Sequence, residues 1–184
     1  MDSMVKVAVC DDEKNTTDYL KLALAGIFDG LGVENEIDVF YLGSDLCRAM
    51  EAGMRYDLIF LDIGFGEGEI NGVEVGHIIR EVHDDVVVSI VYISWEKRYA
   101  DQLFEINTLD FMTKPLTHEN IERIVKRFLK IAFATRWGGG VNLFTKKITS
   151  RMSHRLKTLP IWKLAIAKSS FTCTTAGKTI FTAH

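Results

Sequence analysis

The chain has 184 residues, of which 47% are hydrophobic and only two are proline, a composition typical of a globular protein with one domain and a smaller segment. It has no apolar run near the roughly 18 residues that a membrane span needs, no signal-peptide pattern and no metal-ligand spacing among its three cysteines, so a cytoplasmic location is expected. Residues 1–133 hold all 25 acidic residues and 13 of the 22 basic ones, whereas residues 134–184 hold nine basic residues and no acidic residue.

The first third of the chain alternates between strand-like and helix-like segments. Residues 5–10 are rich in β-branched side chains and predict a strand, and residues 14–31 carry apolar side chains at helical spacing. Residues 36–41 predict a second strand. Ser44 is the expected N-cap of a short second helix, because a serine hydroxyl can accept a hydrogen bond from a free N–H of the first turn.

The third predicted strand, residues 57–62, is a continuous apolar run that ends in Asp62 and precedes a glycine-rich loop. Such a run is typical of a parallel strand buried on both faces. The remaining predicted elements are a helix over 72–82, a strand over 86–93, a helix over 95–104, a strand over 109–112 and a last helix that ends near 133. This alternation predicts an α/β fold with a doubly wound five-stranded parallel sheet.

Polar side chains follow four of the predicted strands where each strand ends. Right-handed crossovers bring these ends to one edge of the sheet. We therefore expect these side chains to converge: Asp11, Asp12, Asp62, Ser94 and Lys114. Alone, the first two could cap a helix and Asp62 could be a turn residue.

Together these residues predict a site that accepts a phosphoryl group. Clustered carboxylates attract a cation, and hard oxygen ligands favour Mg²⁺. The Asp62 carboxylate can act as a nucleophile that forms an aspartyl-phosphate. The Lys114 ammonium and the Ser94 hydroxyl can bind phosphoryl oxygens.

On these residues, together with Lys114-Pro115, the segment 5–133 resembles the receiver domains of two-component response regulators, which have a flavodoxin-like fold. The resemblance implies that Asp62 accepts phosphate from a sensor histidine kinase. It implies a Mg²⁺ site formed by Asp11, Asp12, Asp62 and the Gly64 carbonyl. It also implies that Ser94 and Phe111 form a switch pair and that the Lys114–Pro115 peptide is cis. Phe111 as a plain core aromatic is the alternative.

Two positions depart from the family pattern. Gly66 stands where receivers usually have a proline, and Trp95 directly follows Ser94, where a small residue is common. Both departures lie beside the site, where they would affect the lifetime of the phosphate or access to it.

The segment 134–142 contains three successive glycines and is interpreted as a linker. The spacing of residues 103–115 and the string at 143–147 resemble regulators with a LytTR-type DNA-binding domain, and the basic charge of the tail would suit nucleic-acid phosphates. After 147 the resemblance ends. The codons that could encode residues 156–163 and 171–182 can also be read in the frame that starts at the third base of each codon. In that frame both segments are compatible with strings typical of LytTR domains. We therefore interpret 143–184 as a remnant of that domain, out of frame after about 147; a genuine short basic effector is the alternative.

The sequence thus predicts a response regulator that controls transcription, dimerises on phosphorylation and is a phosphoacceptor rather than an enzyme. On the out-of-frame interpretation of the tail, its DNA-binding output is lost. One alternative is a stand-alone receiver that acts through protein contacts. Another is a Mg²⁺-dependent phosphohydrolase with an aspartyl-phosphate intermediate. Such enzymes usually carry Asp-x-Asp after the first strand, where this chain has Asp11-Asp12.

Overall fold

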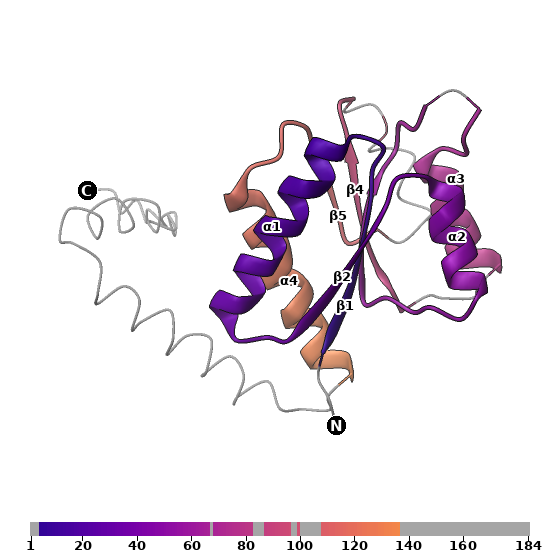
Figure 1. The fold of residues 1–184 in the computed structure, drawn as a ribbon. Coiled ribbons are helices and arrows are strands. Elements are labelled where there is room, and N and C mark those ends of the chain that lie inside the picture. Colours follow the sequence, from indigo (N-terminus) through magenta and orange to yellow (C-terminus); the bar gives the residue numbers. More distant parts are fainter. Residues whose placement is uncertain (1–3, 67, 83–86, 97–98, 100–107, 137–184) are drawn as a thin grey trace, which may run out of the picture. The chain divides into compact units, whose positions relative to one another are not determined.

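The computed structural model describes residues 4–66, 68–82, 87–96, 99 and 108–136 (Figure 1). Strands and helices alternate along them as predicted. The elements are β1 (Val5–Cys10), α1 (Lys14–Leu31), β2 (Asn35–Phe40), α2 (Gly43–Glu51), β3 (Leu58–Asp62), α3 (Gly72–His77), a π-helical segment η1 (Ile78–Val82), β4 (Ser89–Ser94), β5 (Asp110–Thr113) and α4 (His118–Arg136). Most of the predicted helix over 95–104, and the tail beyond 136, lie outside the described residues.

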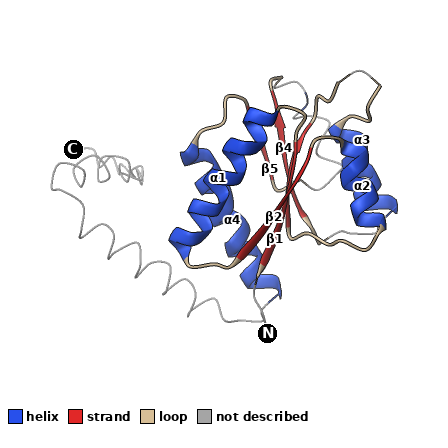
Figure 2. Ribbon diagram, in the orientation of Figure 1, coloured by secondary structure: helices blue, strands red, loops and turns tan. Residues whose placement is uncertain are grey.

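The five strands form one parallel sheet in the order β2-β1-β3-β4-β5, which is the flavodoxin-like order. Helices α1 and α4 cover one face of the sheet, and α2 and α3 cover the other (Figures 1 and 2). The helix after β1 therefore lies on one face of the sheet, and the helix after β2, which leads to β3, lies on the opposite face. This arrangement confirms the predicted doubly wound fold and places its switch point outside the carboxyl ends of β1 and β3.

The centre of the sheet is the core of the domain. All five residues of β3 are buried, and β1 beside it is buried except at one half-exposed position. From one side α1 packs Leu20, Leu24 and Phe28 against the sheet, and each of these side chains is fully buried. Burial of one such side chain stabilises the fold by about 1.5–3 kcal/mol. The last residue of β3, Asp62, is thus held on a rigid element.

The strand register keeps the carboxyl ends of the strands level. Cys10 pairs with Leu61, and Asp62 pairs with Ile93. On the next strand Ser94 pairs with Thr113. The residues that end or follow these strands consequently emerge at one edge of the sheet.

The start of α2 differs from the sequence prediction. The helix begins at Gly43 with Leu42 in the N-cap position, so the prediction of Ser44 as N-cap is wrong. Ser44 lies in the first turn, and its hydroxyl donates to the Glu69 carboxylate at 3.2 Å. A glycine allows the close approach of α2 to α3, because a Cβ on Gly43 would lie 2.6 Å from a methyl carbon of Val75.

Helix α3 begins with a capping box. The Asn71 side chain accepts from the Glu74 N–H, and the Glu74 carboxylate accepts from the Asn71 N–H. The next residue, Gly72, lies against the end of β3: a Cβ there would come within 2.0 Å of the Asp62 carbonyl oxygen. The sequence Asn71-Gly72 therefore fixes where the loop after Asp62 returns to the sheet.

The last helix, α4, continues to Arg136, three residues beyond the predicted end near 133 and into the segment interpreted as a linker. In the part of the chain that the structure describes, no helix combines the length and the apolar character needed to cross a membrane.

Candidate functional site

The carboxyl edge of the sheet holds four buried polar side chains. Asp11 is 0% exposed and Asp62 is 2% exposed. Ser94 and Lys114, at the ends of β4 and β5, are 5% and 8% exposed. The Lys114 N–H donates to the Ser94 carbonyl at 2.9 Å, which ties the ends of these two strands together. The predicted convergence of these four residues is present in the fold, whereas Asp12 is exposed.

The Lys114 ammonium is the centre of the site. Its Nζ lies 2.9 Å from Asp11 Oδ2 and 2.9 Å from Asp62 Oδ1. A third carboxylate oxygen, Glu13 Oε2, accepts a hydrogen bond from it at 3.2 Å. The peptide bond from Lys114 to Pro115 is cis, as expected. One cation is therefore surrounded by three carboxylates, two of which are buried.

Burial determines how these groups titrate. It raises the pKa of Asp62 from 3.8 to about 6, and the Asp11 charge adds to the rise, while Lys114 and the Gly64 N–H oppose it. Burial likewise raises the pKa of Asp11. Burial alone would lower the pKa of Lys114, but the carboxylates of Asp11 and Asp62 outweigh it and raise that pKa. Lys114 therefore stays charged, and Asp62 is mostly ionised at neutral pH.

Comparison with known proteins agrees with this geometry. Residues 7–126, more than half of the chain, match the response regulator receiver domain family. The chain belongs to this family. Its receiver domain is similar to the sensory transduction protein LytT of Bacillus cereus, with 33% identity over 131 residues that cover 69% of this chain and 48% of that protein. It is also similar to the transcriptional regulatory protein LytR of Staphylococcus aureus, with 28% identity over 67% of this chain and 46% of that protein.

The chain thus spans about half the length of these curated relatives. Among solved structures, the receiver resembles the response regulator TrrA from Thermotoga maritima in complex with Mg(2+)-BeF. The identity is 27%, the TM-score is 0.56, and the match covers 68% of this chain and 99% of that chain.

The donor groups of the receiver suit Mg²⁺, although the described residues contain no group of three or more His, Cys, Asp or Glu side chains arranged to hold an ion. Lys114 contacts both Asp11 and Asp62, and Asp12 Oδ2 lies 3.9 Å from where a Cβ of Gly66 would lie. Asp11 Oδ2 is buried and has only the ion pair with Lys114, without hydrogen-bond geometry. A buried carboxylate oxygen that lacks a hydrogen bond is a suitable ligand for a hard cation.

The predicted switch residues lie on neighbouring strands. The Ser94 hydroxyl oxygen accepts from the Glu96 N–H at 3.1 Å, which leaves its proton available to another acceptor. Phe111 is half-buried, stands opposite Tyr92 in the sheet and packs against the core on the α2–α3 side. The intermediate burial of Phe111 fits both a switch residue and a core aromatic. The switch role of Ser94 and Phe111 therefore stays a prediction.

Two residues of the site were not singled out by their sequence. Glu13 binds the same ammonium as Asp11 and Asp62. In the sequence, Glu13 is the last of three consecutive acidic residues, Asp11-Asp12-Glu13, after the first strand. That pattern does not indicate which of the three carboxylates contact Lys114. Gly72, against the Asp62 carbonyl, had no sequence signal beyond the common Asn-Gly pair.

Proposed function

We propose that this receiver accepts a phosphoryl group on Asp62 from a phosphohistidine of a sensor histidine kinase, and that it thereby controls transcription as part of a LytTR-type response regulator. The observation that carries the proposal is the ammonium of Lys114 at 2.9 Å from the buried Asp62 carboxylate. A cation at that position can pair with a phosphoryl oxygen as the negative charge is delivered. The names of the relatives, sensory transduction and transcriptional regulatory proteins, support the same reading.

The chemistry requires the ionised form of Asp62. An Asp62 oxygen attacks phosphorus while the P–N bond to the donor imidazole breaks and its electron pair stays on the imidazole nitrogen. Lys114 binds one phosphoryl oxygen, and the Ser94 hydroxyl, whose proton is available, donates to another. Since the pKa of Asp62 is about 6, the nucleophile is present at neutral pH and is lost by protonation below it.

Mg²⁺ completes the proposed site. Asp11, Asp12, Asp62 and the Gly64 carbonyl would hold it, and the bound ion would neutralise charge on the phosphoryl oxygens. Support comes from the buried Asp11 Oδ2 without a hydrogen bond and from the Mg(2+)-BeF complex of the similar receiver TrrA. We further propose that the chain is a phosphoacceptor, with at most slow loss of its own phosphate, rather than an enzyme.

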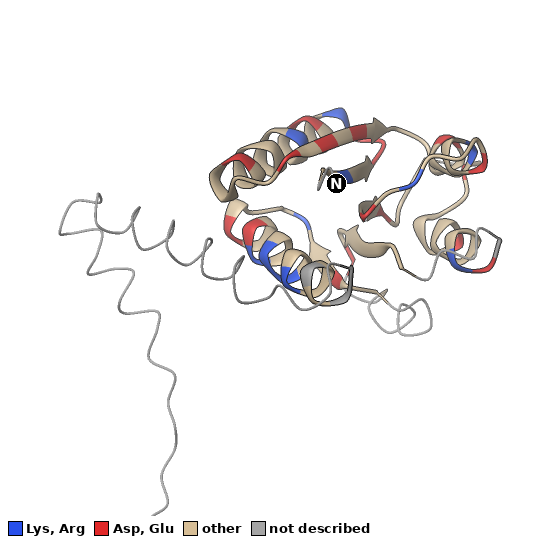
Figure 3. Ribbon diagram, turned by 90° about the horizontal axis from the view of Figure 1, so that it is seen from below, with Lys and Arg blue, Asp and Glu red and all other residues tan. Residues whose placement is uncertain are grey.

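The output would pass through the face formed by β5 and α4. Arg123 and Arg127 of α4 both contact Asp110 at the start of β5, at 2.9 and 3.2 Å. Basic residues are spaced along α4, which also carries Glu119 and Glu122, whereas β2 on the other edge of the sheet has two acidic residues and no basic one (Figure 3). A movement of Phe111 would shift the neighbouring Asp110 and so change its ion pairs with Arg123 and Arg127. We propose that this change favours dimerisation of phosphorylated chains. DNA binding by the tail is expected for the family, and its residues lie outside the described range.

The test is phosphorylation by acetyl phosphate with Mg²⁺, followed by intact-mass measurement of the wild type, Asp62→Asn and Asp18→Asn. Asp18 is an exposed carboxylate of α1 and serves as the matched control. We expect one retained phosphate in the wild type and the control and none in Asp62→Asn. Rapid turnover of the donor without retained phosphate would instead identify a phosphohydrolase. DNA binding measured across a salt series then tests the output.

A further inference from the structure

Glu13 is bound from three directions although its side chain is half-exposed. Its Oε2 atom accepts from the Thr16 hydroxyl at 2.8 Å and from Lys114 at 3.2 Å. Its Oε1 atom accepts from the indole Nε1 of Trp95 at 3.4 Å. The carboxylate therefore connects α1, the end of β4 and the end of β5.

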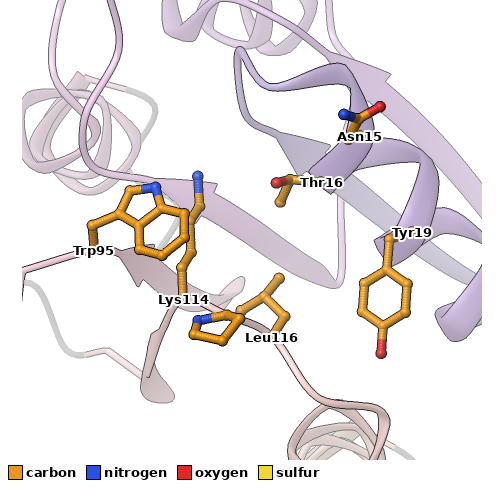
Figure 4. Close-up of a pocket in the computed structure, with 7 residues that line it drawn as sticks. Asn15, Thr16, Tyr19, Trp95, Lys114 and Leu116 are labelled. Atoms are coloured by element: carbon orange, nitrogen blue, oxygen red, sulfur yellow. The ribbon is translucent and has the colours of Figure 1, made fainter.

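Trp95 is the second part of this arrangement. Its side chain is 63% exposed, and its ring centroid lies 6.0 Å from the Lys114 ammonium, at the limit of a cation–π contact. Figure 4 shows the indole ring beside the Lys114 side chain, with the ring nitrogen turned toward the ammonium end. Both residues line an open cavity of about 220 Å³ together with Thr16 and Tyr19 of α1. An exposed tryptophan is thus oriented over a catalytic cation.

Three carboxylates compete for the Lys114 ammonium, and the contact with Glu13 is a hydrogen bond. An ammonium has three N–H groups, and here three carboxylates surround it. A phosphoryl group that arrives on Asp62 brings a further oxygen that competes for this ammonium. Glu13 is the partner that can be given up at least cost, because its side chain is 47% exposed and water can replace the ammonium. Losing Asp11, which is fully buried, would leave an unpaired buried charge, whereas Asp62 gives up its own carboxylate charge when it is phosphorylated.

We propose that Glu13 and Trp95 form a latch that holds Lys114 before phosphorylation and releases it when Asp62 is phosphorylated, so that the latch slows phosphoryl transfer. This inference rests on the proposed phosphoacceptor function. Glu13 opposes transfer in two ways: its charge repels the incoming phosphoryl oxygens, and it competes with them for the ammonium. Trp95 acts through Glu13 and is a positioning residue.

The kinetic test measures the rate of Asp62 phosphorylation by acetyl phosphate with Mg²⁺ in three variants. Glu13→Gln removes the charge and keeps one acceptor oxygen, which can accept from either Thr16 or Trp95, and we expect it to react up to about fivefold faster, the upper end for an exposed ion pair. Trp95→Phe keeps a ring but removes the N–H, and a smaller acceleration is expected. Glu36→Gln is the matched control: Glu36 pairs with Lys6 at 3.3 Å, has a similar exposure of 46%, and should react at the wild-type rate.

A spectroscopic readout separates a latch from a general structural effect. Since the sequence has three tryptophans, the signal of Trp95 is obtained as the difference between the wild type and Trp95→Phe. We expect this emission to change on phosphorylation, to be shifted already in unphosphorylated Glu13→Gln, and to stay constant when acetyl phosphate is added to Asp62→Asn. Equal or slower phosphorylation of Glu13→Gln, or a Trp95 emission that does not respond to it, overturns the latch alone. Absence of phosphate on Asp62 in every variant overturns the proposed function, and the latch with it.

Discussion

Replacing Asp62 with asparagine should stabilise the protein when Mg²⁺ is absent. In the folded state the pKa of Asp62 is raised from 3.8 to about 6, chiefly by burial. A difference of this size corresponds to about 3 kcal/mol of folding free energy, since one pKa unit is about 1.4 kcal/mol. Asparagine has nearly the same shape and carries no charge, and Lys114 keeps Asp11 and Glu13 as partners.

The upward shift of the Asp62 pKa determines how the stability of the protein changes with pH. Because the folded state holds the Asp62 proton more tightly than the unfolded state, this group contributes its stability below its unfolded pKa of 3.8. That stability is lost as the pH rises through about 6. The ionised carboxylate therefore costs about 3 kcal/mol near pH 7.5 and about 1.5 kcal/mol near pH 5. The advantage of Asp62→Asn should shrink by about half over this interval.

Urea unfolding followed by circular dichroism, with EDTA present, measures the effect at both pH values. Asp18→Asn removes an exposed carboxylate from α1 and should leave both the stability and its pH dependence within about 0.5 kcal/mol of the wild type. A variant Asp62→Asn that is no more stable than the wild type near pH 7.5, or whose advantage does not depend on pH, would refute the reasoning. Addition of Mg²⁺ should reduce the difference by stabilising the wild type alone.

Three further substitutions test the packing around the site. Lys114→Met leaves Asp11 and Asp62 together without their cation and should lower the free energy of unfolding near neutral pH by about 3 kcal/mol; a stable variant would mean that the pair is well solvated. Gly72→Ala places a Cβ within 2.0 Å of the Asp62 carbonyl and should cost more than about 2 kcal/mol in the same assay, whereas Gly26→Ala in α1, where a Cβ meets nothing within 4 Å, should cost nothing. Tyr92→Phe removes a buried hydroxyl that has no hydrogen-bond partner among the described residues. The melting temperature of the variant should rise by the equivalent of about 1 kcal/mol of unfolding free energy, and a fall would reveal a partner for that hydroxyl.

The sequence was sufficient for the architecture and for the main participants of the site. A parallel strand buried on both faces is apolar along most of its length. The apolar run before Asp62 therefore predicted both β3 and the residue at which it ends. The handedness of the crossovers then required the residues after β1, β3, β4 and β5 to meet at one edge. Asp11, Asp62, Ser94 and Lys114 could be predicted together because topology alone brings them there.

Tertiary contacts decided which of these groups touch. Asp11, Asp12 and Glu13 are consecutive and acidic, yet Asp11 and Glu13 contact Lys114 while Asp12 faces Gly66. The direction of each side chain depends on where the strand ends and α1 begins, and periodicity does not fix that point. The same holds for Leu42 in place of Ser44 as the N-cap of α2 and for Gly72 against the Asp62 carbonyl. Local sequence determines which residues reach the edge of the sheet, whereas the packing of neighbouring elements determines their partners.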